Sequence, residues 1–263
     1  MPGMGKGKAK GLAKAKGATV VKGTEDDDVI VGGDGKQVVM GRDGDDDIGG
    51  GGGNDVLLGG AGADSLEGGL GDDVMNGGAD DDTLYSISWG GEPEIAQEVE
   101  AGAEKVEPDE PLSDDDVLSG GEGADTFVFR WLIDAKTEIL DKHRDAGGDV
   151  DYRAVAGENG AAHDHWVETI GDDTVTDFDP EVDELVFEGH TVTLQSAELV
   201  DADGDGVVDD TLLTFRSEQG GAGAHQDDAV GTVTLLDVEV TADDVTIDKG
   251  VFYGVESPFD AAG

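Results

Sequence analysis

Cysteine is absent from the 263-residue chain, so no disulfide can stabilise it and thiolate zinc sites are excluded. Aromatic residues make up only 5%, and eleven of the thirteen lie between Phe127 and Phe259. A conventional core is therefore expected only in the C-terminal half. No apolar run approaches the length needed to span a bilayer, and the N-terminal MPGMGKGKAKGLAKAKG lacks the apolar segment of a cleavable secretory signal. We expect no membrane insertion.

Basic residues are also scarce. The chain has 16 Lys and Arg against 63 Asp and Glu, for a net charge of −47. The first 22 residues hold six lysines and no acid, so the remainder carries −53. Such a body repels phosphate, which excludes nucleic acid as a partner, and without cations its own repulsion opposes compaction. Residues 1–22 are expected to form a flexible basic tail ending in a starting strand at 18–21; contact of the tail with anionic polysaccharide or lipid is the alternative.

Motifs of common enzymes are missing: there is no GxSxG, no HExxH and no phosphate-binding glycine loop. Four histidines are the candidates for a second metal, namely His163, His165, His190 and His225. They are expected to be ordinary hydrogen-bonded or exposed histidines near Trp166, and a second metal site is the alternative. We therefore expect no enzymatic activity.

A nine-residue pattern, GGxGxDxUx with U a large apolar residue, fills residues 23–85 without a gap. Its seven units are GTEDDDVIV, GGDGKQVVM, GRDGDDDIG, GGGGNDVLL, GGAGADSLE, GGLGDDVMN and GGADDDTLY. Position six is Asp in all but one unit, where it is Gln37. This period fits neither an amphipathic helix nor a conventional strand and is typical of calcium-binding parallel β-helix repeats. A disordered charged linker matches the composition, but it gives no reason for the constant phase of acid and apolar residue.

Each unit divides into a six-residue loop and a three-residue strand, so two units make one turn of a flattened coil. Glycines allow the tight loops to turn backbone carbonyls toward a common point, where the position-six carboxylate completes an oxygen cage. Such a cage suits Ca²⁺ better than Mg²⁺. We expect ions between units 23 and 41, 41 and 59, and 59 and 77 on one edge, and between 32 and 50, and 50 and 68 on the other. Gln37 should weaken its own site, because an amide brings no charge.

These repeats resemble those of the RTX family, the hemolysin-type calcium-binding repeats of bacterial secreted proteins. The resemblance implies an all-β fold with a right-handed parallel β-roll. PLSDDDVLS and GGEGADTFV restore the register after an excursion at 86–110, which extends the roll over residues 23–130 and raises the number of expected sites to about seven. The predicted calcium ligands of the roll are Asp28, Asp46, Asp55, Asp64, Asp73, Asp82, Asp116 and Asp125. The segment DDTVTDFDPEVDELVF resembles the region that follows such repeats.

Residues 131–263 should form a β-rich cap domain that contains a short helix at 136–144, six strands from VTDF onward and a C-terminal secretion region. Within it, DADGDGVVDD places Asp201, Asp203 and Asp205 at the spacing of the first half of an EF-hand loop. The twelfth position is Leu212 instead of Glu, so a calcium-binding hairpin loop is expected; an empty acidic turn is the alternative.

These patterns predict a secreted protein that binds several Ca²⁺ ions, folds on reaching extracellular calcium and acts as an interaction or structural element at the cell surface or in the matrix. The resemblance implies export by type I secretion. Candidate partners besides calcium are cell-surface polysaccharide and other extracellular proteins. The alternative is an RTX-associated enzyme or carbohydrate-binding accessory whose chemistry lies in the C-terminal segment.

Overall fold

The computed structural model describes residues 19–33, 35–87, 115–131, 133–135, 142, 163–167, 170–189, 192–217 and 229–248. Residues 1–18, most of the expected excursion and helix, His190, His225 and the C-terminal secretion region lie outside the described residues. His163 and His165 lie on a described strand, β12. Among the described residues, no helix is long and apolar enough to cross a membrane.

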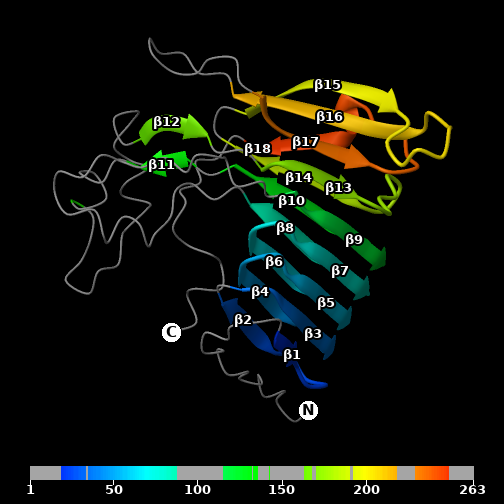
Figure 1. Cartoon of the computed structure of the whole chain (residues 1–263). Helices are drawn as coiled ribbons and strands as arrows, with labels where there is room; N and C mark the ends of the chain where they lie inside the picture. The colour runs from blue at the N-terminus through cyan, green and yellow to red at the C-terminus, as the bar shows by residue number, and fades with distance from the viewer. Residues whose placement is uncertain are drawn as a thin grey trace.

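Most strands belong to two sheets, and within each sheet the strands are stacked one above the next (Figure 1). The first has nine strands in the order β1-β3-β5-β7-β9-β13-β17-β16-β15, and the second has seven in the order β18-β14-β10-β8-β6-β4-β2. Odd-numbered repeat strands therefore fall in one sheet and even-numbered ones in the other. The repeat strands are β1 (Thr19–Lys22), β2 (Val29–Gly33), β3 (Gln37–Asp43), β4 (Asp47–Gly52), β5 (Val56–Ala61), β6 (Ser65–Leu70), β7 (Val74–Ala79), β8 (Thr83–Ile87), β9 (Val117–Glu122) and β10 (Thr126–Arg130).

The register of these parallel strands follows the repeat. Val38 pairs with Val56 and Val56 with Val74, an offset of 18 residues, which is two units for each turn. The register survives the excursion, because Val74 pairs with Val117. The expected stacking of alternate units, including the two units after the excursion, is therefore confirmed.

The interior of the roll is one column of position-eight side chains. They are 0–2% exposed, because alternate residues of a strand point to opposite faces and both sheets turn this position inward. The column consists of Ile30, Val39, Ile48, Leu57, Leu66, Met75, Leu84, Leu118 and Phe127.

The two sheets do not end with the repeats. Strand β13 (Asp172–Val175) pairs in parallel with β9, and β14 (Glu184–Glu188) pairs in parallel with β10. Beyond them, β17 (Ala229–Leu235) and β18 (Val245–Asp248), the latter preceded by the 3-10 helix η1 (Ala242–Asp244), add one more parallel strand to each sheet. The roll thus continues across residue 130, where the sequence places the start of the cap.

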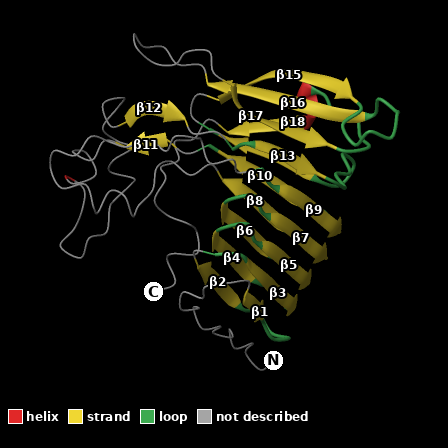
Figure 2. Cartoon of the chain, viewed as in Figure 1, coloured by secondary structure: helices red, strands yellow, loops and turns green. Residues whose placement is uncertain are grey.

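The C-terminal strands also provide the aromatic core that the sequence predicts for this half. The antiparallel strands β15 (Val192–Val200) and β16 (Asp210–Ser217) complete the nine-stranded sheet, and β11 (Ile133–Ala135) pairs with β12 (His163–Val167) separately (Figure 2). Phe187 packs against Phe215 with ring centroids 4.4 Å apart, and Trp131 lies 5.0 Å from Phe215. The all-β class and the parallel roll are confirmed.

Tight loops at the sheet edges explain the glycines of the repeat. Most of the described glycines at positions two and four have positive φ, for example Gly60 at 133° and Gly62 at 123°, whereas Gly33 at position two does not. Arg42 at position two (φ 103°) and Asp80 at position four (φ 79°) adopt this conformation although they carry a Cβ. Positive φ is unfavourable for L-residues, so both positions store strain.

We expect Arg42→Gly to stabilise the roll by about 1 kcal/mol, because glycine adopts the observed φ without penalty. Arg42→Ala is the matched control, since it removes the same exposed charge and keeps the Cβ. Urea unfolding in saturating calcium measures both. An equal effect of the two substitutions would assign the change to the lost charge and contradict the strain.

Candidate calcium sites

The eight position-six aspartates all lie at the turn between loop and strand, and all are buried with only 1–2% of their surface exposed. Carboxylates are rarely buried to this degree unless they are paired or bind a metal. The repeat thus stacks its acids in two columns, one at each edge of the roll, with each acid two residues before an interior apolar side chain.

From Asp46 onward, one oxygen of each position-six carboxylate holds two turns together. The backbone N–H of Asp46 donates to Oδ1 of Asp64 at 2.8 Å, and the N–H of Asp64 donates to Oδ1 of Asp82 at 2.8 Å. The same bond joins Asp28 to Asp46, Asp55 to Asp73, Asp73 to Asp116 and Asp82 to Asp125, at 2.6–2.9 Å. Each acid therefore satisfies a backbone donor that the strand ladder leaves open.

The other oxygen explains why a metal is needed. Oδ2 of Asp46, Asp55, Asp64 and Asp82 is fully buried and has no hydrogen-bond partner. An unsatisfied buried polar atom is costly, more so when it is charged. Each of these oxygens therefore requires a proton or a cation.

The surroundings of Oδ2 are built from backbone. A Cβ added to Gly50 would lie 2.8 Å from Oδ2 of Asp55 and close to the Gly68 carbonyl oxygen of the next turn. The same pairing of a position-six carboxylate with a carbonyl oxygen one turn away surrounds Gly23, Gly41 and Gly59. Oxygen donors from two successive turns thus converge beside a position-one glycine. An all-oxygen set of this kind fits Ca²⁺, which would neutralise the carboxylates and supply the missing partner of Oδ2.

The raised pKa values of the buried carboxyls also favour a bound cation. Burial raises the pKa of Asp46 to about 6 and the pKa values of Asp55, Asp64 and Asp82 to about 7. The backbone N–H of the preceding turn donates to each of these carboxylates and offsets part of this rise in pKa. Repulsion from stacked acids adds to the rise at Asp64, where Asp82 and Asp46 contribute. Without a metal, the carboxyls of Asp55, Asp64 and Asp82 would still be about half protonated at pH 7, and a bound divalent cation would displace these protons.

Two further aspartates continue the columns beyond the repeats. Asp173 accepts the N–H of Asp116, and Asp183 accepts the N–H of Asp125, both at 2.9 Å. Their second oxygens differ from those of the repeats: Ser86 Oγ donates to Oδ2 of Asp173 at 2.9 Å, and the N–H of Asp179 donates to Oδ2 of Asp183 at 2.8 Å. At Asp173 and Asp183, protein donors thus bind the second carboxylate oxygen, whereas the equivalent oxygen of the aspartates in the middle of the roll has no partner.

Asp173 and Asp183 are absent from the predicted ligands, although the sequence contains a signal for them. Asp173 precedes the buried Val175 by two residues, and Asp183 precedes the buried Leu185 by two, as position six precedes position eight in the repeat. The nine-residue spacing and most of the repeat's glycines are missing around them, although Gly171 precedes Asp173 by two residues, as position four precedes position six, and has a φ of 85°.

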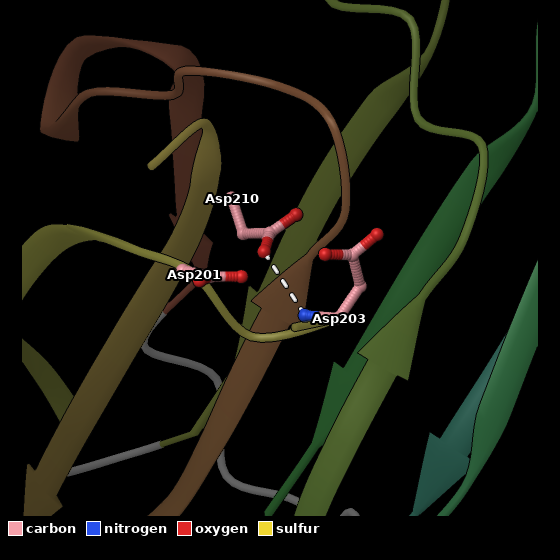
Figure 3. Close-up of side chains that lie close together, drawn as sticks. All are labelled: Asp201, Asp203 and Asp210. Atoms are coloured by element: carbon pink, nitrogen blue, oxygen red, sulfur yellow. Dashed lines mark hydrogen bonds between the residues drawn. The ribbon is translucent and has the colours of Figure 1, made fainter. Parts of the chain in front are cut away.

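The predicted calcium loop near residue 205 connects β15 to β16. Asp201 and Asp203 come together with Asp210, with carboxylate oxygens within 4.8 Å of one another (Figure 3). Asp209, Asp210 and Asp237 form a second group of this kind, so Asp210 belongs to both. Asp205 is in neither group; its Oδ1 accepts the N–H of Val207 at 2.7 Å.

Asp210, which the sequence reasoning did not select, is the centre of this loop. Its side chain is fully buried and accepts the N–H groups of Asp237 at 2.9 Å, Ala202 at 2.6 Å and Asp203 at 3.2 Å. These bonds, that from Asp237 above all, hold the pKa of Asp210 below its usual value. Backbone donors thus hold the Asp210 carboxylate in place within the loop. Calcium binding by Asp201, Asp203 and Asp205 stays a prediction.

Comparisons with known proteins identify the repeats. A family model described as the RTX calcium-binding nonapeptide repeat (four copies) matches residues 16–48, 49–84 and 112–129. A comparison with curated proteins finds no match.

Two solved structures give weak global superpositions. The AlgE6R3 subunit of the Azotobacter vinelandii mannuronan C5-epimerase is 22% identical, with 87% of this chain and 81% of that chain covered and a TM-score of 0.27. The extracellular lipase LipA of Serratia marcescens is 19% identical, with 89% and 40% covered and a TM-score of 0.26, so the chain spans about two fifths of that lipase.

The repeat match covers the same residues whose strands form the stacked turns and whose buried aspartates converge on backbone carbonyls. Sequence family, register and oxygen chemistry therefore agree. The chain carries RTX-type calcium-binding nonapeptide repeats between residues 16 and 129.

Proposed function

We propose that this protein is a secreted, non-enzymatic calcium-binding element whose roll folds when it reaches extracellular calcium, and that it acts at the cell surface or in the matrix. The observation that supports this proposal most directly is the column of buried carboxylate oxygens without hydrogen-bond partners. A folded roll without cations has to keep these oxygens protonated or leave them charged and unsatisfied. Metal binding and folding are then one equilibrium.

The non-enzymatic part of the proposal rests on how the described strands are used. All of them except β11 and β12 belong to the two sheets of the roll. Within the described part of the chain, the strands are thus accounted for by the repeats and by their continuation.

We expect the calcium-stripped protein to lose most of its β-sheet signal near neutral pH and to regain it cooperatively on titration with calcium. The midpoint should lie at about 10⁻⁴ to 10⁻³ M, as in extracellular calcium modules. Far-UV circular dichroism measures the transition, and Mg²⁺ at the same concentration is the control, because it prefers a tighter octahedral shell. A β signal that is complete without calcium and unchanged by millimolar calcium would exclude conditional folding.

Export is tested by where the protein accumulates. In cells that carry a type I secretion channel, the full chain should appear in the medium, and a chain that lacks residues 249–263 should stay inside. Removal of residues 1–18 is the control, because the proposal gives the basic tail no part in export. Equal export of the chain without residues 249–263 would contradict a C-terminal signal.

A further inference from the structure

Gln37 is the one residue other than Asp at position six of the nine repeat units. Its main chain behaves like that of its neighbours, since its N–H donates to Oδ1 of Asp55 at 2.6 Å. Its side chain is also buried, with 6% exposed. The substitution has therefore left the stacking of turns unchanged, and the difference lies in the chemistry of the side chain.

The carboxamide of Gln37 is bonded entirely within its own loop. Nε2 donates to the carbonyl oxygen of Gly33 at 3.0 Å and to the carbonyl oxygen of Gly35, while Oε1 accepts the N–H of Gly33 at 3.0 Å. The positively polarised NH₂ group thus faces two backbone carbonyl oxygens. A bound cation would be contacted by the same two oxygens.

We propose that the Gln37 carboxamide takes the place of a calcium ion in the loop of residues 32–37, so that this loop closes without metal. An aspartate at the same position has only acceptors, and its second oxygen stays unsatisfied, as at Asp55 on the same edge. The amide supplies both donors and acceptor from one neutral group. The extra methylene lets it reach the carbonyl at position four of the loop.

The position of this loop gives the substitution a consequence for folding. Strand β3, which starts at Gln37, lies between β1 and β5 near the first edge of the nine-stranded sheet. A turn that closes without calcium at this end offers an ordered template on which the loop of Asp55 can bind its ion. We therefore expect calcium-dependent folding to extend from this end of the roll. The inference rests on the proposed function, because it assumes that the other loops bind calcium.

Counting ions tests the proposal. Wild-type protein and the Gln37→Asp variant are dialysed together against the same calcium buffer, and bound calcium per chain is measured by atomic emission. Gln37→Asp should bind one ion more than the wild type. The reverse exchange, Asp55→Gln on the same edge, should bind one ion fewer, because it brings the carboxamide into the neighbouring loop.

The outcomes separate this inference from the proposed function. If wild type and Gln37→Asp bind the same number of ions, greater than zero, position 37 carries no special role and the inference is overturned alone. If neither binds calcium, both are overturned.

A second measurement needs no variant and covers the case in which Gln37→Asp does not fold. In calcium-loaded protein with ¹⁵N-labelled glutamine, the side-chain NH₂ of Gln37 should exchange with solvent at least tenfold more slowly than that of the exposed Gln195. Equal exchange rates would show that the carboxamide is not held by the loop and would overturn the proposal.

Discussion

Gly59→Ala is expected to prevent the central turns of the roll from closing at calcium concentrations that fold the wild type. A Cβ at Gly59 would lie 2.5 Å from the carbonyl oxygen of Gly77 and 2.9 Å from the Cβ of Asp64, and it would also meet Oδ2 of Asp64. Two of these are oxygen donors of the same candidate site. The added methyl group therefore takes the space in which the ion and its ligands converge.

The size of the loss of stability in Gly59→Ala depends on whether the groups around the added Cβ can move away. The Gly77 carbonyl belongs to the backbone of the next turn, and the Asp64 carboxylate is held by the N–H of Asp46, so neither can yield without breaking the stack. Overpacking of this kind costs about 1–3 kcal/mol, which corresponds to a folding equilibrium lowered roughly 5- to 150-fold. Circular dichroism during calcium titration should show a higher midpoint and a smaller final β signal.

Gly33→Ala is the matched control. Gly33 is also a loop glycine of the repeat, but an added Cβ would meet nothing within 4 Å, and its φ is not positive. We expect this variant to fold at nearly the wild-type calcium concentration. If Gly59→Ala also folded at that concentration, or if both variants failed equally, crowding of the candidate site would not be the cause.

The strict period made the central roll predictable. Nine residues with one acid and one apolar position define the turn, the register and the interior column, so the burial of Asp64 and Leu66 follows from their places in the pattern. The resumed register at Asp116 and Asp125 was predictable for the same reason, because each again stands two residues before an apolar side chain.

Other features depend on distances that the sequence does not encode. The N–H of Asp116 meets the carboxylate of Asp173, 57 residues later, and no fixed period links the two. Asp210 accepts the backbone N–H groups of Ala202 and Asp237, and these groups come together only after β16 and β17 have paired. The sequence predicts that Gln37 weakens a calcium site, but only the folded loop decides whether its amide turns oxygen or nitrogen toward the loop carbonyls.

The pH dependence of stability should have opposite signs with and without calcium. Burial raises the pKa values of Asp55, Asp64 and Asp82 to about 7 in the metal-free roll, whereas the unfolded chain loses these protons near pH 4. Between these values the folded state binds more protons, so its stability falls as pH rises toward 7. Calcium-stripped protein should therefore be more folded at about pH 5.5 than at about pH 8.

Calcium reverses this order because the ion and the proton compete for the same oxygens. In about 10 mM calcium, the bound carboxylates are ionised, and acidification should release the ions and destabilise the roll. Urea unfolding of the stripped and the loaded protein at both pH values measures the two slopes. The acidic limit has to stay above the isoelectric point of about 4.1, where loss of net charge favours precipitation.

General repulsion among the many acids would also favour the stripped roll at low pH, and a pair of variants separates the two causes. Asp64→Asn removes a buried carboxyl with a raised pKa, keeps an acceptor for the N–H of Asp46 and should reduce the pH slope of the stripped protein. Asp43→Asn removes the same charge from an exposed position of the same edge, at a residue that is not among the acids that raise the pKa of Asp64. Equal slopes in the two variants would assign the effect to net charge, whereas a loss confined to Asp64→Asn would locate it in the buried column, where protons and calcium exchange.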